Sequence, residues 1–143
     1  MNKNKLPNRV DCQIVYKKNP IADLMLLIEL KTVRKNAYNI IAGPSDQEGV
    51  VVITYDEIMK QAGKQLELAL MDFDPIEKAF TGDISVKVMS YEDLKNAIGA
   101  YELFKSVGWY PEYYRDHLEK AMQIVKRIDI TAIEIDFKIN SAQ

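Results

Sequence analysis

The 143-residue chain contains one cysteine, one histidine and one tryptophan, and this scarcity excludes several kinds of chemistry. With a single cysteine, Cys12, the chain can form neither an internal disulfide nor a metal site that takes two thiolates from it. Because Cys12 alternates with Val10 and Ile14, we interpret it as a small buried side chain rather than a reactive thiol. A Ser-His-Asp or Cys-His arrangement would need His117, which lies beside apolar positions of a predicted helix and is interpreted as a surface or boundary histidine.

Glycine and long apolar segments are scarce as well. The six glycines are scattered, so the chain has no glycine-rich loop of the kind that binds phosphate. The longest apolar run, residues 24–28, is far too short to cross a bilayer, and we expect no membrane partner. The first residues, MNKNKLPNR, are polar and basic and precede no apolar stretch, so we expect no secretory signal and a cytoplasmic protein.

Charge is distributed unevenly along the chain. Residues 1–42 carry a net charge of +5, residues 43–90 carry −5 and residues 91–143 carry −2. The acidic middle argues against nucleic acid as the main partner, because binding to phosphates needs a surplus of lysine and arginine. The length, with 48% hydrophobic and 28% charged residues, predicts a single globular domain over residues 1–143.

Alternation of apolar with polar residues, the period of a strand with one buried face, recurs along the chain. This alternation predicts strands over residues 10–16, 24–33, 84–88 and 133–139. The β-branched run of residues 50–54 and the short segment of residues 37–42 are predicted to be strands as well. Residues 66–71 (LELALM) have leucines two positions apart, and we prefer a strand there, although a helix that continues to residue 71 remains an alternative. Residues 72–83 are expected to form a loop.

Two capping boxes mark the starts of helices. Thr54 precedes Glu57 by three positions, and Ser90 precedes Asp93 in the same way. Beyond them, apolar residues recur every three or four positions, which is the period of a helix with one buried face. The predicted helices span residues 55–62, 91–107 and 111–128.

The order of these elements predicts the fold class. Strands come first, a short helix lies between two of them, a helical hairpin over residues 91–128 follows, and a strand closes the chain. This order is not the regular alternation of a parallel α/β sheet. We therefore predict an α+β fold, an antiparallel β-sandwich with a helical hairpin before its last strand. Gly99 is interpreted as a point of close packing between the hairpin helices, and residues 1–9 and 141–143 are expected to be flexible.

Two stretches of the first ninety residues, NPIADLMLLIEL and SDQEGVVVIT, pair a Pro-initiated strand of alternating aliphatics with a Ser-Asp-x-x-Gly turn that leads into a β-branched strand. With the short helix that follows, residues 10–90 resemble the transthyretin-like (prealbumin-like) modules found as accessory domains of carboxypeptidases. The resemblance implies an immunoglobulin- or prealbumin-like sandwich with a non-catalytic binding or structural role, and it supplies no catalytic residues. The loop itself is interpreted as a turn in which Gly49 adopts a positive φ.

Carboxylates gather in the predicted loop over residues 72–83. Asp72, Asp74 and Asp83, with Glu77 between them, are weak candidates for oxygen ligands of a hard cation. Their spacing matches no calcium loop and the central glycine is missing, so we expect no metal and no cofactor. General acid–base catalysis by two of these carboxylates would need a pocket that the sequence does not identify.

Aromatic residues are densest at the predicted bend of the helical hairpin. Trp109, Tyr110 and Tyr113 are candidates for a partner-binding surface, because aromatic side chains with a polar tip are favoured in protein interfaces. The alternative is that they cap one end of the core. Tyr114 belongs to the buried face of the helix by its spacing.

Three functions follow from these observations. The first hypothesis is a non-enzymatic protein-binding or assembly module, which uses a sheet edge or the aromatic bend to contact another protein or itself. The second is a small hydrolase or metal-dependent enzyme that uses the carboxylates of Asp72, Asp74 and Asp83. The third is a self-associating structural subunit. The sequence favours a protein that is not an enzyme, and it identifies no small-molecule ligand.

Overall fold

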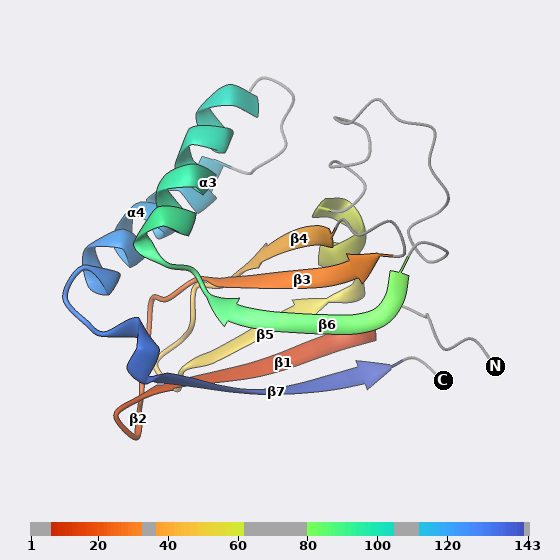
Figure 1. The fold of residues 1–143 in the computed structure, drawn as a ribbon, viewed down its shortest axis with the longest axis horizontal. Helices are drawn as coiled ribbons and strands as arrows, with labels where there is room; N and C mark the ends of the chain where they lie inside the picture. The colour runs from red at the N-terminus through yellow and green to blue at the C-terminus, as the bar shows by residue number, and fades with distance from the viewer. Residues whose placement is uncertain (1–6, 33–36, 62–79, 105–111, 142–143) are drawn as a thin grey trace.

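The computed structural model of the chain describes residues 7–32, 37–61, 80–104 and 112–141. Within these residues the chain has two antiparallel sheets and three α-helices (Figure 1). The predicted α+β class and the antiparallel pairing are therefore confirmed.

The first sheet is built around β1 (Pro7–Tyr16). One side of β1 pairs along its whole length with β7 (Ile133–Ser141), and the other side pairs with β5 (Val50–Thr54) and then with β2 (Asn19–Pro20). The alternation predicted these strands, but β1 begins before Val10 and β7 continues beyond Ile139, because the two ends pair with each other. Of the ends predicted to be flexible, residues 7–9 and 141 lie in these strands, and the others lie outside the described residues.

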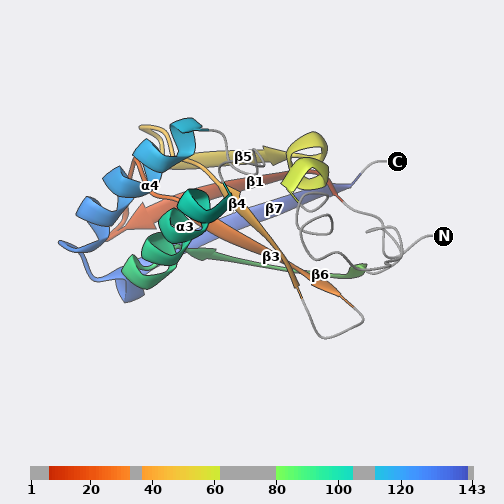
Figure 2. The ribbon, with the colours of Figure 1, turned by 90° about the horizontal axis from the view of Figure 1, so that it is seen from above.

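The second sheet has the strand order β4-β3-β6, with β3 (Leu26–Thr32) in the middle. Its neighbours are β4 (Ala37–Ala42), whose bounds agree with the prediction, and β6 (Phe80–Val88). Seen from above, the second sheet lies over the first, and the two converge toward the end where the helices lie (Figure 2).

β6 begins earlier than expected. Residues 80–83 belong to the segment predicted to be a loop, yet they continue the strand up to the pair Thr32↔Phe80. The pairing with β3 shifts register between Leu30 and Thr32, and Gly82 adopts a φ of 97°. Glycine tolerates this conformation, so the strand continues through the irregularity. The alternating pattern is interrupted there, which is why it predicts a strand only from residue 84.

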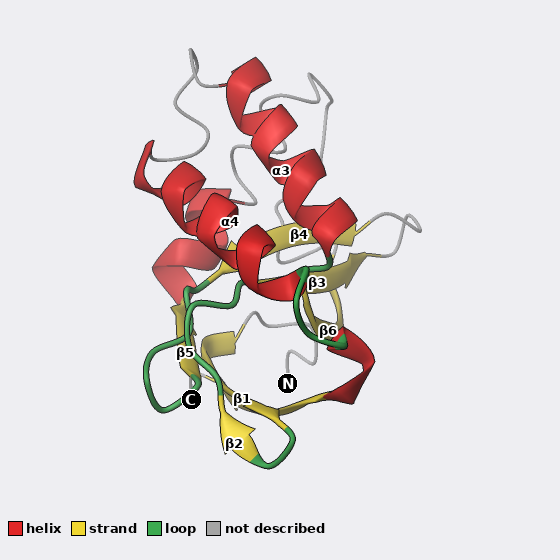
Figure 3. Ribbon diagram, turned by 90° about the vertical axis from the view of Figure 1, so that its left-hand side faces the viewer, coloured by secondary structure: helices red, strands yellow, loops and turns green. Residues whose placement is uncertain are grey.

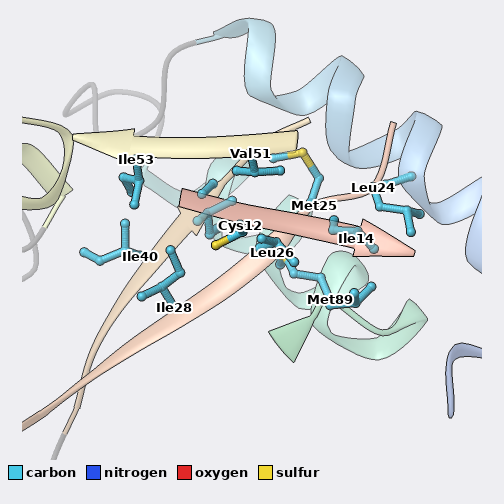
Figure 4. Close-up of a cluster of buried hydrophobic side chains, with 14 of the residues drawn as sticks. Cys12, Ile14, Leu24, Met25, Leu26, Ile28, Ile40, Val51, Ile53 and Met89 are labelled. Carbon is cyan, nitrogen blue, oxygen red and sulfur yellow. The ribbon is translucent and has the colours of Figure 1, made fainter. Parts of the chain in front are cut away.

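Both sheets contribute to one hydrophobic core. Figure 4 shows side chains of β1 and β5 pointing toward side chains of β3 and β4. The fully or nearly fully buried members include Cys12, Ile14, Leu26, Ile28, Ile40, Val51 and Ile53. The predicted burial of alternate residues is confirmed on β1 and β3, whereas on β4 the consecutive residues Ile40, Ile41 and Ala42 are all buried.

The helices lie at the two ends of the sheets. The described part of the short inter-strand helix, residues 55–61, lies at the end to which β5 runs, and α3 (Tyr91–Phe104) and α4 (Glu112–Val125) lie side by side at the other (Figures 1 and 3). Leu94 of α3 and Leu118 of α4 are fully buried against the core. Residues 105–111, which join α3 to α4, lie outside the described residues, so the helical hairpin stays a prediction.

The caps of these helices differ in quality. At α3, Ser90 and Asp93 form the complete capping box, because the N–H of Asp93 donates to Ser90 Oγ (3.1 Å) and the N–H of Ser90 donates to Asp93 Oδ2 (3.0 Å). At the short helix, the N–H of Glu57 donates to Thr54 Oγ1 over 3.4 Å. The box at Ser90 is confirmed, and it fixes the direction in which the chain leaves β6.

The acidic loop before β5 is a turn with hydrogen bonds both within the loop and to β1. Asp46 Oδ1 accepts from the N–H groups of Glu48 and Val50, each at 2.9 Å. Gly49 has a φ of 76°, as predicted, and its carbonyl accepts from the N–H of Ile14 (2.7 Å). The loop therefore aligns β5 with β1.

Two buried polar side chains hold backbone groups that no strand satisfies. Ser45 Oγ accepts from the N–H of Leu24 (3.0 Å) and donates to the carbonyl of Ile21 (2.8 Å). Because the N–H of Leu24 bonds the side chain of Ser45 rather than a neighbouring strand, β3 begins at Leu26 and not at the predicted Leu24. Gln61 donates to the carbonyl of Ile41 and accepts from its N–H, both at 2.8 Å, and so occupies the edge of β4 as a strand would.

Gly49→Ala is expected to destabilise the fold by about 2 kcal/mol or more. A Cβ at Gly49 would collide with the carbonyl oxygen of Ile14, and the positive φ would be strained in alanine. Urea unfolding measures the change. A variant as stable as the parent chain would contradict the role given to this turn.

Gly99→Ala is expected to have the opposite effect. A Cβ at this exposed position of α3 would meet nothing within 4 Å, so the predicted close packing at Gly99 is wrong. Alanine in a helix interior should raise the free energy of unfolding by about 0.5–1 kcal/mol. The same unfolding measurement, with Gly49→Ala as its counterpart, tests this, and a loss of stability would contradict it.

Candidate functional site

The candidate site is the outer edge of β7. This strand pairs with β1 on one side, and no other described strand pairs with its second side. Edge strands expose a row of backbone N–H and C=O groups that can pair with another chain. We call this row, together with the side chains of Ile135, Phe137 and Ile139, the β7 edge.

The direction of the backbone groups follows from the bonds of β1. The N–H and C=O of Ile14 point away from β7, because they bond Gly49 and Ile21. In an antiparallel ladder alternate residues point their backbone groups to opposite sides, so those of Asp11 and Gln13 face β7. Their partners on β7 are Lys138 and Asp136. The polar residues of β7 thus hold β1, and its apolar residues direct their backbone groups outward.

The side chains of the same apolar residues are only partly covered. Ile133 and Ile135 are half-buried, whereas Phe137 and Ile139 keep 39% and 40% of their surface exposed. On β5, which also ends the sheet, the residues of the core-facing row, Val51 and Ile53, are buried. Among the described edges of the first sheet, β7 is therefore the one that exposes its core-facing row.

A hollow of about 570 Å³ lies between β6 and β7. Strand residues of both sheets line it, together with the start of α3 and the short 3-10 turn before β7 (Ile130–Ala132). Its apolar wall consists of Val86, Val88, Ile130, Ile133 and Ile135. The hollow continues the apolar row of β7 toward the half-buried end of the strand.

The polar wall of this hollow is the cap of α3. Lys87 Nζ lies 3.5 Å from Asp93 Oδ2, which also accepts the N–H of Ser90. Partial burial raises the pKa of the Asp93 carboxyl, but the hydrogen bonds from Ser90 and the charge of Lys87 outweigh it, and the net pKa lies below its usual value. The Asp93 carboxylate therefore takes part in both the helix cap and the ion pair with Lys87.

A second hollow, of about 620 Å³, lies between the faces of α3 and α4. Charged and amphipathic side chains line it: Lys95, Ile98, Asp116, Glu119, Lys120, Met122 and Gln123. Around it, Arg115 Nη1 lies 2.6 Å from Glu102 Oε1, and Lys120 Nζ lies 3.4 Å from Asp23 Oδ2. These ion pairs tie α4 to α3 and to the loop before β3.

Cys12 lies in the core, as predicted. Burial raises the pKa of its thiol to about 11, and the neighbouring carboxylate of Asp11 adds to the rise. The thiolate is the reactive form, so Cys12 is an inert core residue near neutral pH.

Of the other candidates for chemistry, His117 and Asp83 are among the described residues. His117 is half-buried on α4, and Asp83 is exposed on β6. Asp72, Asp74 and Glu77 lie outside the described residues. Among the described residues, no three His, Cys, Asp or Glu side chains are arranged to hold a metal ion.

The aromatic candidates stay a prediction. Trp109 and Tyr110 lie outside the described residues, and of Tyr113 only the helical backbone, in the first turn of α4, is described. None of the described helices is both long enough and apolar enough to span a membrane.

The sequence pattern predicts β7 as a strand but does not indicate that its edge is a site. The alternation IEIDFKIN fixes which side chains share a face, whereas the pairing order of the strands decides which edge stays open. Comparisons with protein families, with curated proteins and with solved structures find no match to this chain.

The assignment of backbone directions predicts different effects of proline at neighbouring positions of β7. Phe137→Pro removes an N–H that points outward, whereas Lys138→Pro removes one that faces β1. Relative to alanine at the same position, Lys138→Pro should cost at least about 1 kcal/mol more stability than Phe137→Pro, the scale of one backbone hydrogen bond. Urea unfolding of the four variants, at a concentration low enough that the chain is monomeric, tests this, and equal costs would refute the assignment.

Proposed function

We propose that the chain is a non-enzymatic protein-binding or assembly module, and that the β7 edge is its binding surface. One observation carries the proposal. β7 is a long edge strand whose outward backbone groups belong to the apolar residues, and two of these residues, Phe137 and Ile139, also have exposed side chains on one face of the sheet. Addition of a strand to such an edge gives affinity through the main chain and specificity through alternate side chains.

A comparison of edges within the molecule supports this surface. On β4, the side chain of Gln61 bonds both backbone groups of Ile41 and so blocks a further strand. Natural proteins also protect edges with charges that point inward or with very short strands. β7 has nine residues, and its charged side chains lie on the face opposite the core. The device that closes β4 has no described equivalent on β7.

We also propose that the two sheets form a sandwich of the transthyretin-like type and that α3 and α4 form a hairpin. The core shared by both sheets and the turn at Asp46 to Gly49 support the first point. Contact between α3 and α4 supports the second. Such modules present sheet edges and loops, which agrees with a binding role.

The binding role is tested with a photo-crosslinking benzophenone residue at position 139, in cells that produce the chain. A covalent adduct to a protein, whether another protein or a second copy, is expected. Val52, which is 48% exposed on β5, provides the matched control because it is apolar and exposed but lies on the outer face of the sheet. No protein adduct from position 139, or equal adducts from both positions, would contradict the proposal.

A further inference from the structure

We propose that the β7 edge binds a second copy of this chain, by antiparallel pairing of β7 with the partner's β7 about a two-fold axis at Phe137. This inference rests on the proposed binding role of the edge and adds the identity of the partner. It is carried by the complementarity of β7 with itself in one register.

The apolar row of β7 matches itself about Phe137. In this register Phe137 lies opposite the partner's Phe137, and Ile135 lies opposite the partner's Ile139. A two-fold axis perpendicular to the sheet keeps these side chains on one face. The exposed aromatic and aliphatic groups of both copies thereby become cross-strand neighbours, which stabilises antiparallel pairing.

The charged row matches in the same register. Asp136 lies opposite the partner's Lys138, and by symmetry Lys138 lies opposite the partner's Asp136. Glu134 lies opposite the partner's Asn140, so no like charges face each other. All three charged side chains are exposed in the single chain and are available for these contacts.

Neighbouring registers lack this complementarity. An axis at Asp136 or at Lys138 places that residue opposite its own copy, so like charges meet. An axis at Ile135 places Glu134 opposite the partner's Asp136. Axes between residues exchange the faces, so apolar side chains would oppose polar ones. Of the registers near the centre of the strand, the one at Phe137 alone satisfies both rows.

The backbone is suited to this pairing. Phe137 directs its N–H and C=O outward, so at the axis the two Phe137 residues exchange both hydrogen bonds. Ile135 and the partner's Ile139 do the same on either side. The contact is isologous and closed, since it uses the same edge of both copies and leaves no further β7 edge for a third.

The first test uses charge reversal and sedimentation equilibrium of the purified chain. Wild type should form a dimer with increasing concentration. Asp136→Lys and Lys138→Asp should each raise the dissociation constant by about tenfold or more, because each creates two like-charged pairs across the axis. An equimolar mixture of the two variants should restore association as a heterodimer, because each pair again joins opposite charges.

The mixture separates pairing from folding. Lys138→Asp also places a carboxylate opposite Asp11 of its own β1, which weakens the first sheet in that chain. Mixing cannot repair a folding defect, so recovered association reports the contact between copies. Added salt should reduce the differences between variants, since it screens exposed charges. Failure of the mixture to associate more tightly than either variant alone would overturn the register.

The second test locates the axis. In a Cys12→Ala background, Phe137→Cys should form a disulfide with its own copy on oxidation, because the Cα atoms of such a pair are about 5.5 Å apart. Ile135→Cys, the control on the same row, should not, because in this register its own copy lies about four residues away along the strand, beyond disulfide reach. Crosslinking through Ile135→Cys instead would overturn the proposed axis.

The outcomes distinguish this inference from the broader proposal. If the purified chain remains monomeric while position 139 crosslinks a different protein, self-pairing is wrong and the binding role stands. If the chain is monomeric and no protein is crosslinked, both are wrong. A monomer whose Phe137 amide is nevertheless protected from hydrogen exchange would show that the chain itself covers the edge, and this too overturns self-pairing.

Discussion

The pairing of β1 with β7 is the constraint on which the rest of the structure depends. It joins the first described strand of the chain to the last. The chain must therefore come back to β1 after forming the second sheet and both long helices. A polar contact reinforces it near one end, where the side-chain amide of Asn140 on β7 donates to Asp11 of β1 (2.7 Å). At the other end, the N–H of Asp129 donates to the hydroxyl of Tyr16 over 3.4 Å.

The same pairing determines which chemistry β7 presents. The backbone N–H and C=O of Ile14 bond Gly49 and Ile21, so they point away from β7. The alternate residues Asp11 and Gln13 therefore direct their backbone groups toward β7, where they lie opposite its polar residues. The apolar residues of β7 are then left with outward backbone groups and with side chains at the margin of the core. The turn at Gly49, which has a positive φ and lies against Ile14 of β1, therefore fixes which residues of β7 direct their backbone groups outward.

Local features of the fold could be predicted from the sequence, and tertiary ones could not. Alternation identified β1 and β7, short apolar and β-branched runs identified β4 and β5, and the spacing of Ser90 and Asp93 identified the start of α3. Each of these signals depends on a few neighbouring residues. The early start of β6 at Phe80 depends on a register shift against β3. The burial of Ser45 and Gln61 depends on backbone groups more than fifteen residues away in the chain. The candidate site, the β7 edge, belongs to this second kind, because β7 becomes an edge strand only through the pairing order of the strands.

The β4 edge, which Gln61 closes, and the open β7 edge differ in where their polar side chains lie. On β4 a buried amide reaches the backbone directly and occupies the place of a strand, and a further chain would have to displace it at the cost of leaving polar groups unbonded. On β7 the polar side chains stand perpendicular to the edge, on the outer face, where they neither bond the outward N–H groups nor obstruct them. Charges in this position do not repel every strand. They repel strands with the wrong charge order and favour one with the reverse order, which β7 itself supplies when it is read in the opposite direction.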